Sequence, residues 1–263
     1  MFQKVADQVS RFLVGGLFIF SGLIKLNDPI GTQIKMEEYF EVFAVDFGSF
    51  FHVFIPYALE IGMLMIVLEV VLGVAVLIYY RMKVTAWVLL VLIVFFTFLT
   101  GYSHFLDKVT DCGCFGDAIK LTPKESFIKD IILLVFVLHL FWYRKRYLPV
   151  LRTLEGHAVI GVVTAVSLFL GIYAIRHLPF LDFRAYKVGN NIMQEMIPEE
   201  QPVIEYIFDK NGEEVRSQKY LPESEGYTYK NSRILNEDKT VAKITDYAVS
   251  TEDGEDVTQE TFE

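Results

Sequence analysis

The sequence predicts an all-α membrane bundle, built from a four-helix core and a fifth transmembrane helix, with a small β-rich C-terminal module outside the membrane. Three observations lead to this fold class. Hydrophobic residues make up 53% of the 263 residues, which is high for a soluble domain. Five stretches are long and apolar enough to cross a bilayer. The excess of acidic residues is confined to the last third of the chain.

The five apolar stretches predict five membrane spans. A bilayer core about 30 Å thick needs roughly 20 mostly apolar residues per helix. The stretches of suitable length are residues 9–26, 54–80, 84–105, 125–143 and 156–175. No small-residue cleavage site follows the first, so we expect a retained helix rather than a signal peptide. The fourth has a defined start, because Thr122-Pro123-Lys124-Glu125 fits a capping box with proline in the first turn.

The orientation follows from the basic residues in the short connections. Alternating helices place three basic groups on one side of the membrane: Lys4 and Arg11; Arg81 and Lys83; and Arg144, Lys145, Arg146 and Arg152. Short loops rich in Lys and Arg stay in the cytoplasm. We therefore expect a bacterial inner-membrane protein with five spans, a cytoplasmic N-terminus and a periplasmic C-terminus. The long loop at 27–53 then lies outside.

The tail differs from the rest of the chain in charge and pattern. Residues 1–175 carry 14 basic and 14 acidic residues, whereas residues 176–263 carry 10 basic and 19 acidic residues. This acidity disfavours nucleic acid as a partner. Strands are predicted at 203–208 and 213–220, around a hairpin signal at Asp209-Lys210-Asn211-Gly212, and at 227–235 and 240–249. The expected divisions are a bundle at 1–145, a cytoplasmic basic loop and fifth helix at 146–177, and an acidic periplasmic module and linker at 178–263.

Cys112 and Cys114 are the chain's two cysteines and lie in a polar loop between the third and fourth spans. This loop is expected in a disulfide-permissive compartment. A redox pair, a static turn staple, and half of a metal site shared with a partner are all open. The redox interpretation is favoured, because a disulfide across one residue closes a strained ring and is a weak staple. His104 is either interfacial or a cation that supports a thiolate.

Two carboxylates lie within the second predicted span. Glu60 is expected near the outer interface, where Lys25 ends the first span, and this favours a Lys25–Glu60 ion pair. Glu69 lies about 13 Å deeper, where a charge is costly and suggests function. Its expected state is protonated or hydrogen-bonded, with Thr97 as a candidate partner. A proton or quinone role and a buried polar lock between helices remain equally open. Asp130, in the fourth span, is given no special role.

Three stretches resemble the DoxX/MauE superfamily: Ser21-Gly22-Leu23-Ile24-Lys25-Leu26-Asn27-Asp28-Pro29, the segment from Glu69 to Gly73, and Asp111-Cys112-Gly113-Cys114-Phe115-Gly116-Asp117. The resemblance covers about residues 1–145 and implies a four-helix membrane bundle. Its MauE branch implies a role in disulfide formation or maturation of extracytoplasmic proteins. Its DoxX branch implies an electron-transfer subunit linked to quinone. Quinone is therefore a candidate cofactor, and no cofactor is certain.

Residues 181–192 and 254–258 resemble a Bacteroidota subgroup of DoxX-like proteins, in which a thioredoxin-like domain often follows. We expect a short form or an incomplete sequence here. The partner thiols are then expected on a periplasmic thioredoxin-like protein or on other inner-membrane proteins. The leading hypothesis is an electron relay in periplasmic thiol–disulfide exchange through the Cys-Gly-Cys loop. The alternative is a non-enzymatic accessory subunit of a membrane complex for protein export, folding or envelope biogenesis.

Overall fold

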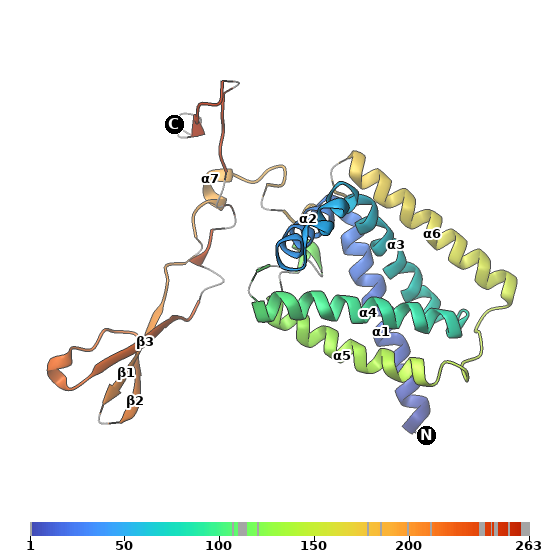
Figure 1. Cartoon of the computed structure of the whole chain (residues 1–263), viewed down its shortest axis with the longest axis horizontal. Helices are drawn as coiled ribbons and strands as arrows, with labels where there is room; N and C mark the ends of the chain where they lie inside the picture. The colour runs from blue at the N-terminus through green and yellow to red at the C-terminus, as the bar shows by residue number, and fades with distance from the viewer. Residues whose placement is uncertain are drawn as a thin grey trace. The chain divides into compact units, whose positions relative to one another are not determined.

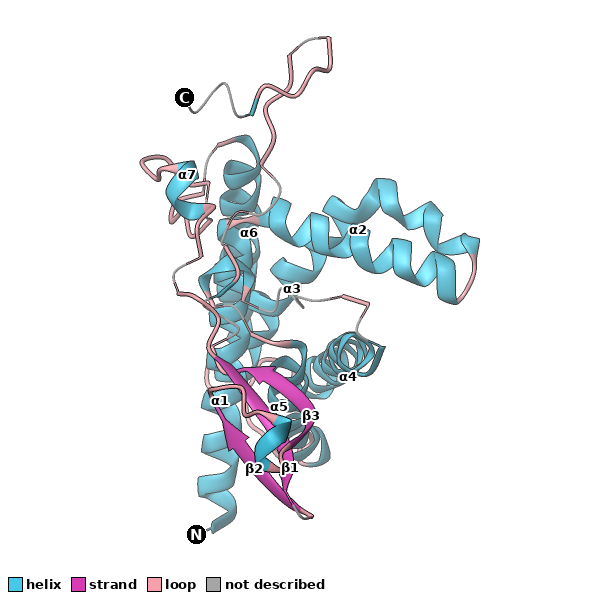
Figure 2. Cartoon of the chain, turned by 90° about the vertical axis from the view of Figure 1, so that its left-hand side faces the viewer, coloured by secondary structure: helices cyan, strands magenta, loops and turns pink. Residues whose placement is uncertain are grey.

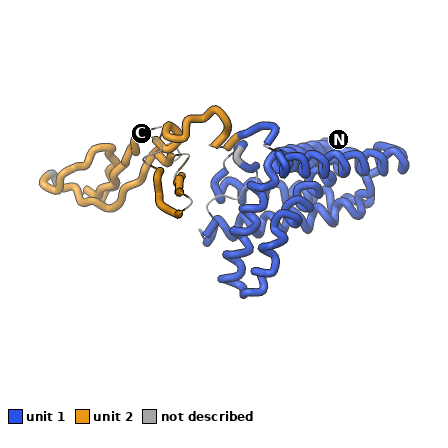
Figure 3. Tube along the Cα trace, turned by 90° about the horizontal axis from the view of Figure 1, so that it is seen from above, with its two compact units in different colours: residues 1–182 blue, residues 183–263 orange. Residues whose placement is uncertain are grey.

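The computed structural model divides the chain into two compact units, residues 1–182 and residues 183–263 (Figure 3). The structure describes residues 2–106, 108–109, 115–119, 121–177, 179–184, 186–198, 200–210, 212–236, 240–242, 244, 247–251 and 253–258. The first unit is helical and the second contains a small sheet. Each unit is described by itself below.

The first unit is a bundle of long helices (Figure 1). Its elements are α1 (Phe2–Asn27), α2 (Pro29–Asp46), the 3-10 helix η1 (Ser49–Tyr57), α3 (Ala58–Leu77), α4 (Met82–Leu106), the short 3-10 helix η2 (Gly116–Ala118), α5 (Pro123–Trp142) and α6 (Thr153–Arg176). Helix α1 packs mainly on α3, α4 packs on α5, and α6 lies against α3 and α1. The central core joins α1, α3, α4 and α5 through residues such as Val14, Val76, Leu89 and Val137.

Four helices have the length and apolar composition of membrane spans. They are Gln3–Asn27, Ser49–Leu77, Met82–Leu106 and Thr153–Arg176. These correspond to four of the five predicted spans, and the protein is a membrane protein. Helix α5 carries Lys124, Glu125, Lys129 and Asp130 in its first half. The predicted span at 125–143, which falls on α5, therefore stays a prediction, as do the total of five spans and the placement of the termini.

Glycines allow α1 and α3 to approach closely. A methyl group added at Gly73 would lie 2.8 Å from the carbonyl oxygen of Gly15, and one added at Gly22 would lie 2.5 Å from Val70 Cγ2. Small residues are the usual means by which membrane helices approach each other. The contact matters for the site described below, because α1 and α3 each contribute polar side chains to it.

The expected long loop at 27–53 is wrong, because most of it forms α2. The helix begins where Asp28 accepts a hydrogen bond from the backbone of Gly31 (3.1 Å), with Pro29 in its first turn. Its buried residues are Pro29, Met36, Tyr39, Phe40, Phe43 and Ala44, and from Met36 onward their spacing of three and four is that of an amphipathic helix. The intervening charged residues had masked this pattern in a search for uniformly apolar segments.

The predicted start of α5 is confirmed. Glu125 N–H donates to Thr122 Oγ1 (3.3 Å), and Thr122 N–H donates to Glu125 Oε2 (2.9 Å). This reciprocal pair satisfies two backbone donors that have no partner inside the helix. The capping box therefore fixes the residue at which α5 begins, after the cysteine loop.

The second unit contains a three-stranded antiparallel sheet in the order β2-β1-β3 (Figure 2). Its strands are β1 (Ile204–Lys210), β2 (Glu213–Ser217) and β3 (Thr228–Ile234), with the short helices α7 (Ile192–Glu195) and η3 (Glu223–Glu225) beside them in sequence. The first three predicted strands are confirmed. The described residues between 240 and 249 form no strand, so the fourth was wrong over those positions. Phe208 is fully buried.

Candidate functional site

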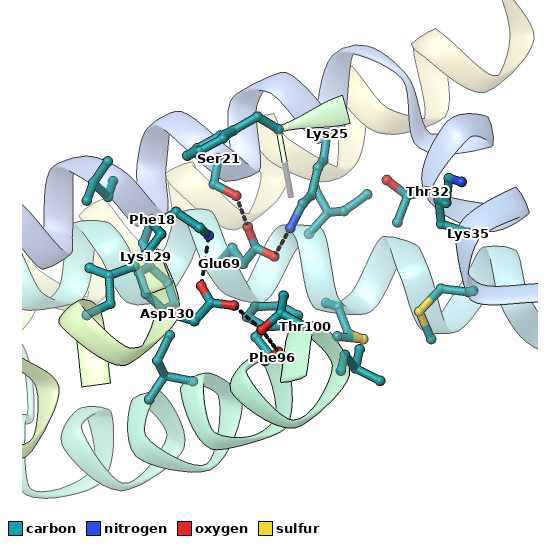
Figure 4. Close-up of a pocket in the computed structure, with 18 of the residues that line it drawn as sticks. Phe18, Ser21, Lys25, Thr32, Lys35, Glu69, Phe96, Thr100, Lys129 and Asp130 are labelled. Atoms are coloured by element: carbon teal, nitrogen blue, oxygen red, sulfur yellow. Dashed lines mark hydrogen bonds and ion pairs between the residues drawn. The ribbon is translucent and has the colours of Figure 1, made fainter. Parts of the chain in front are cut away.

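The bundle contains a pocket between α1, α2, α3, α4 and α5 (Figure 4). Phe115 is one of its lining residues. The pocket holds about 840 Å³ of space not filled by atoms, part of it open to solvent. Most lining residues are apolar, and the polar ones are Ser21, Lys25, Thr32, Lys35, Tyr39, Glu69, Thr100, Lys129 and Asp130.

One wall carries an ion pair between α1 and α3. Lys25 Nζ lies 2.6 Å from Glu69 Oε1, and Ser21 Oγ donates to Glu69 Oε2 at 2.9 Å. Ser21 and Lys25 are four residues apart and therefore share one face of α1. Only 2% of the Glu69 side chain and 11% of the Lys25 side chain are exposed. The lysine ammonium also lies 4.9 Å from the ring centre of Phe96, where a cation is favourable.

A second ion pair lies on the wall formed by α4 and α5. Lys129 Nζ is 2.8 Å from Asp130 Oδ1, and Thr100 Oγ1 donates to Asp130 Oδ2 at 3.0 Å. Asp130 is 1% exposed. The Lys129 ammonium lies 5.1 Å from the ring centre of Phe115. Both pairs thus consist of a lysine, a buried carboxylate and a hydroxyl, with one set from each of two packed helix pairs (Figure 4).

In each of the two ion pairs, the lysine compensates the negative charge of the buried carboxylate. An isolated charge in an apolar interior is very costly, whereas a paired and hydrogen-bonded one is tolerated. Each carboxylate accepts from a lysine and a hydroxyl, and the pocket therefore presents an ammonium group on each of two walls within a largely apolar lining. Such a pocket suits a mostly apolar molecule with two hydrogen-bond acceptors.

The cysteine loop meets this pocket at Phe115. Cys112 and Cys114 themselves lie outside the described residues, as do all of 110–114. Phe115 is 7% exposed, lines the pocket, and packs its ring 5.6 Å from that of Phe20. Cys114 is the next residue in the chain, and neighbouring Cα atoms are about 3.8 Å apart. On the other side of the gap, Val109 is fully buried.

Asp46, the last residue of α2, ties that helix to the start of the loop. Its carboxylate accepts hydrogen bonds from Lys108 and from Tyr102. The hydrogen bond from Lys108, followed by that from Tyr102, lowers the pKa of Asp46 below its ordinary value, because both donors favour the charged form. The residues on the two sides of 110–114 are therefore both anchored to the bundle.

The expected Lys25–Glu60 ion pair is wrong. Lys25 pairs with Glu69, while Glu60 is exposed at the start of α3. The physical reason is that the long lysine stem can direct its ammonium inward, where the buried Glu69 carboxylate needs a compensating cation. Thr97, the expected partner of Glu69, instead donates to the Ile93 carbonyl of its own helix (2.7 Å).

His104 lies near the end of α4 but is not among the pocket-lining residues. Its ring lies 4.9 Å from that of Phe105 and 6.0 Å from that of Phe127. A role in supporting a thiolate stays a prediction, and the described contacts of this side chain are with aromatic rings.

Sequence reasoning missed the second ion pair. Asp130 was given no role, although the structure buries it as deeply as Glu69. The available signal was the same for both residues: an acidic residue within a predicted membrane span indicates function or a buried partner. Lys129 beside it and Thr100 on α4 could not be assigned from spacing alone, because the pairing of α4 with α5 is a tertiary feature.

Comparison with known proteins supports the membrane-bundle assignment. The family described as methylamine utilisation protein MauE matches residues 3–143, which is more than half of the chain. "Protein TlpB" of Flavobacterium psychrophilum is 29% identical over 166 residues, which cover 61% of this chain and 42% of that protein. The chain thus spans less than half of this relative's length. No solved structure matches. The family match covers residues 3–143, and the structure there is a bundle of long apolar helices. The chain therefore belongs to the MauE family of membrane proteins.

Proposed function

We propose that this protein relays electrons in periplasmic thiol–disulfide exchange, with Cys112 and Cys114 as the redox pair and the polar pocket as the acceptor site. In this proposal the chain crosses the inner membrane five times, with its N-terminus in the cytoplasm and the cysteine loop and acidic module in the periplasm. A separate thioredoxin-like protein or another inner-membrane protein supplies the reacting thiols. The role in disulfide formation or maturation that the MauE resemblance implies agrees with this reaction class.

The observation that carries the proposal is the position of Phe115. This residue follows Cys114 directly and forms part of the pocket wall. In this proposal, an electron pair at Cys114 is one residue away along the chain from the pocket lining.

The exchange balances in two steps. A partner dithiol loses two electrons and two protons as its two sulfurs join, and the Cys112–Cys114 disulfide takes them up and becomes two thiols. When the Cys112–Cys114 bond forms again, two electrons and two protons pass to the acceptor. The strain of a disulfide across one residue favours the first step, because strained disulfides are more readily reduced.

A quinone is the acceptor class that fits the pocket. It would supply a ring that accepts two electrons and two protons at two carbonyl oxygens. The Lys25 ammonium would provide a donor for one oxygen and the Lys129 ammonium a donor for the other, because an ammonium carries three N–H groups. The apolar lining, which includes Phe18, suits the ring and holds water away from it.

Trapping of the partner tests the exchange. Replacing Cys114 by Ala removes the resolving thiol, so Cys112 is expected to hold its partner as a mixed disulfide that survives until a reductant is added. The matched control is Cys112→Ser with Cys114→Ser, which cannot form this adduct. An absence of adduct with normal disulfide content in exported proteins would contradict the proposal. Full tolerance of the double Ser variant would instead favour the accessory-subunit function.

Binding of decylubiquinone to the purified chain in detergent tests the acceptor site. Lys25→Met and Lys129→Met are each expected to weaken binding about tenfold or more, because a hydrogen bond to a charged donor contributes about 1.5–3 kcal/mol. Glu60→Gln, an exposed change outside the pocket lining, is the control and should bind like the wild type. If the pocket variants bind decylubiquinone as the wild type does, the quinone assignment fails while the thiol exchange can stand.

A further inference from the structure

A second pocket lies between the turn that follows α3 and the start of α6. It holds about 340 Å³ of space not filled by atoms, part of it open to solvent, and its polar lining includes Tyr80, Arg81, Arg152, Thr153 and His157. It shares no lining residue with the pocket beside Phe115. Nothing in the proposed redox function uses these residues, so the inference drawn from them stands apart from that function.

The pocket is built by close contacts between the two connections. Val150 N–H donates to the Ile78 carbonyl at 3.0 Å, which holds the segment before α6 against the end of α3. The rings of Tyr80 and His157 meet edge to face at 5.5 Å. A methyl group at Gly156 would lie only 3.1 Å from Tyr80 Cδ2, so the small residue permits this approach.

The lining of this pocket contains two arginines and no acidic residue. Neither the Arg81 nor the Arg152 guanidinium forms an ion pair with a described carboxylate. Glu155 is the acidic residue of the first turn of α6, and its Oε2 accepts the backbone N–H of Arg152 at 3.1 Å. The N-terminus of α6 adds partial positive charge to the same place. The site is therefore suited to an anion, and guanidinium groups bind phosphate oxygens in a bidentate manner.

The position of the pocket indicates where such an anion would come from. Three spans begin or end around it: α3 ends at Leu77, α4 begins at Met82 and α6 begins at Thr153. Ends of membrane spans lie at the level of lipid headgroups. Exposed apolar side chains lie nearby, with Trp87 (53%) in the second turn of α4 and Leu154 (82%) in the first turn of α6, and aromatic residues are typical of this interface.

We propose that Arg81 and Arg152 bind the phosphate group of an anionic phospholipid at this end of the bundle. The guanidinium groups and the first N–H groups of α6 hold the phosphate, and Tyr80 and His157 form the side of the pocket. The acyl chains extend along the apolar faces of the neighbouring spans. Basic pockets between transmembrane helices are known to bind lipid headgroups in this way.

Native mass spectrometry of the full chain, released from nanodiscs that contain equal parts of phosphatidylglycerol and phosphatidylcholine, tests the proposal. The wild type is expected to retain phosphatidylglycerol in preference to phosphatidylcholine. Arg81→Gln with Arg152→Gln should reduce the retained phosphatidylglycerol about tenfold or more, because two charge-assisted contacts are lost. Arg81→Lys with Arg152→Lys keeps the charge and should retain an intermediate amount.

The matched control is Lys83→Gln with Lys145→Gln, which removes two exposed charges that do not line the pocket. It should retain phosphatidylglycerol as the wild type does. Equal loss in both double variants would overturn the site in favour of a diffuse basic surface. Displacement of the lipid by millimolar inorganic phosphate would identify a free-phosphate site instead. Unchanged thermal unfolding of the Arg81/Arg152 variant establishes that loss of lipid reflects binding.

Discussion

Lys25 of α1 and Glu69 of α3 form an ion pair inside the bundle, with 2.6 Å between Nζ and Oε1. Removing one partner of a buried pair leaves the other charge uncompensated and costs about 3–5 kcal/mol. We therefore expect Glu69→Gln and Lys25→Met each to lower the free energy of unfolding by about that amount. The double variant removes both charges and should lose much less than the sum. A double-mutant cycle of denaturation in detergent measures this coupling.

Glu60→Gln is the control for this cycle, because Glu60 was the partner expected from the sequence and is exposed in the structure. Its free energy of unfolding should change by no more than about 0.5 kcal/mol. If Glu60→Gln destabilises the protein as much as Glu69→Gln does, or if the two changes at Lys25 and Glu69 are additive, the ion pair assigned here is incorrect.

The contrast between Glu60 and Glu69 shows how far the sequence can lead. The length of the apolar stretches predicted the long helices. The presence of an acidic residue within a predicted span indicated that Glu69 is important. The partner was wrong, because estimates of depth along a helix do not capture the reach of a lysine stem. Helix α2 was not predicted because charged residues are interspersed among its buried ones, so it lacks a long apolar stretch. Asp130 was undervalued because its partner Thr100 comes from another helix, and only the packing of α4 on α5 brings them together.

The close approach of α1 and α3 predicts a steric effect at Gly73. A methyl group there would lie 2.8 Å from the Gly15 carbonyl oxygen and 2.9 Å from the Ile19 backbone nitrogen, and backbone atoms cannot move aside cheaply. We expect Gly73→Ala to lower the free energy of unfolding by about 1–3 kcal/mol, the usual cost of overpacking. Denaturation of the purified protein in detergent measures the change.

Gly16→Ala is the matched control for Gly73→Ala. A methyl group at Gly16 meets no atom within 4 Å, and Ala favours a helix more than Gly does. The stability of this variant should equal or slightly exceed that of the wild type. Equal loss of stability in both variants would mean that glycine matters for helix flexibility here rather than for the contact between α1 and α3.

Asp209 of β1 and Lys230 of β3 form an ion pair, with 2.7 Å between Oδ2 and Nζ. This pair predicts that the stability of the sheet depends on pH. Hydrogen bonding by Lys230, and then by the Gly212 N–H, lowers the pKa of Asp209 below its ordinary value of 3.8. A lowered folded-state pKa means that the stabilisation is fully present above 3.8 and is lost as the pH falls through the folded-state value. The pair therefore stabilises the sheet at neutral pH and fails in acid.

The carboxyl resonance of Asp209, followed by NMR in the full chain in detergent micelles, measures this pKa. The midpoint in the wild type should lie below 3.8, and Lys230→Met should move it upward because the largest cause of the shift is removed. Arg233→Met is the control, since Arg233 pairs with Glu205 at 2.7 Å on the same two strands and should leave the Asp209 midpoint in place. A midpoint that does not respond to Lys230→Met would show that the Gly212 turn alone holds the carboxylate, and the sheet would then keep its acid sensitivity without the lysine.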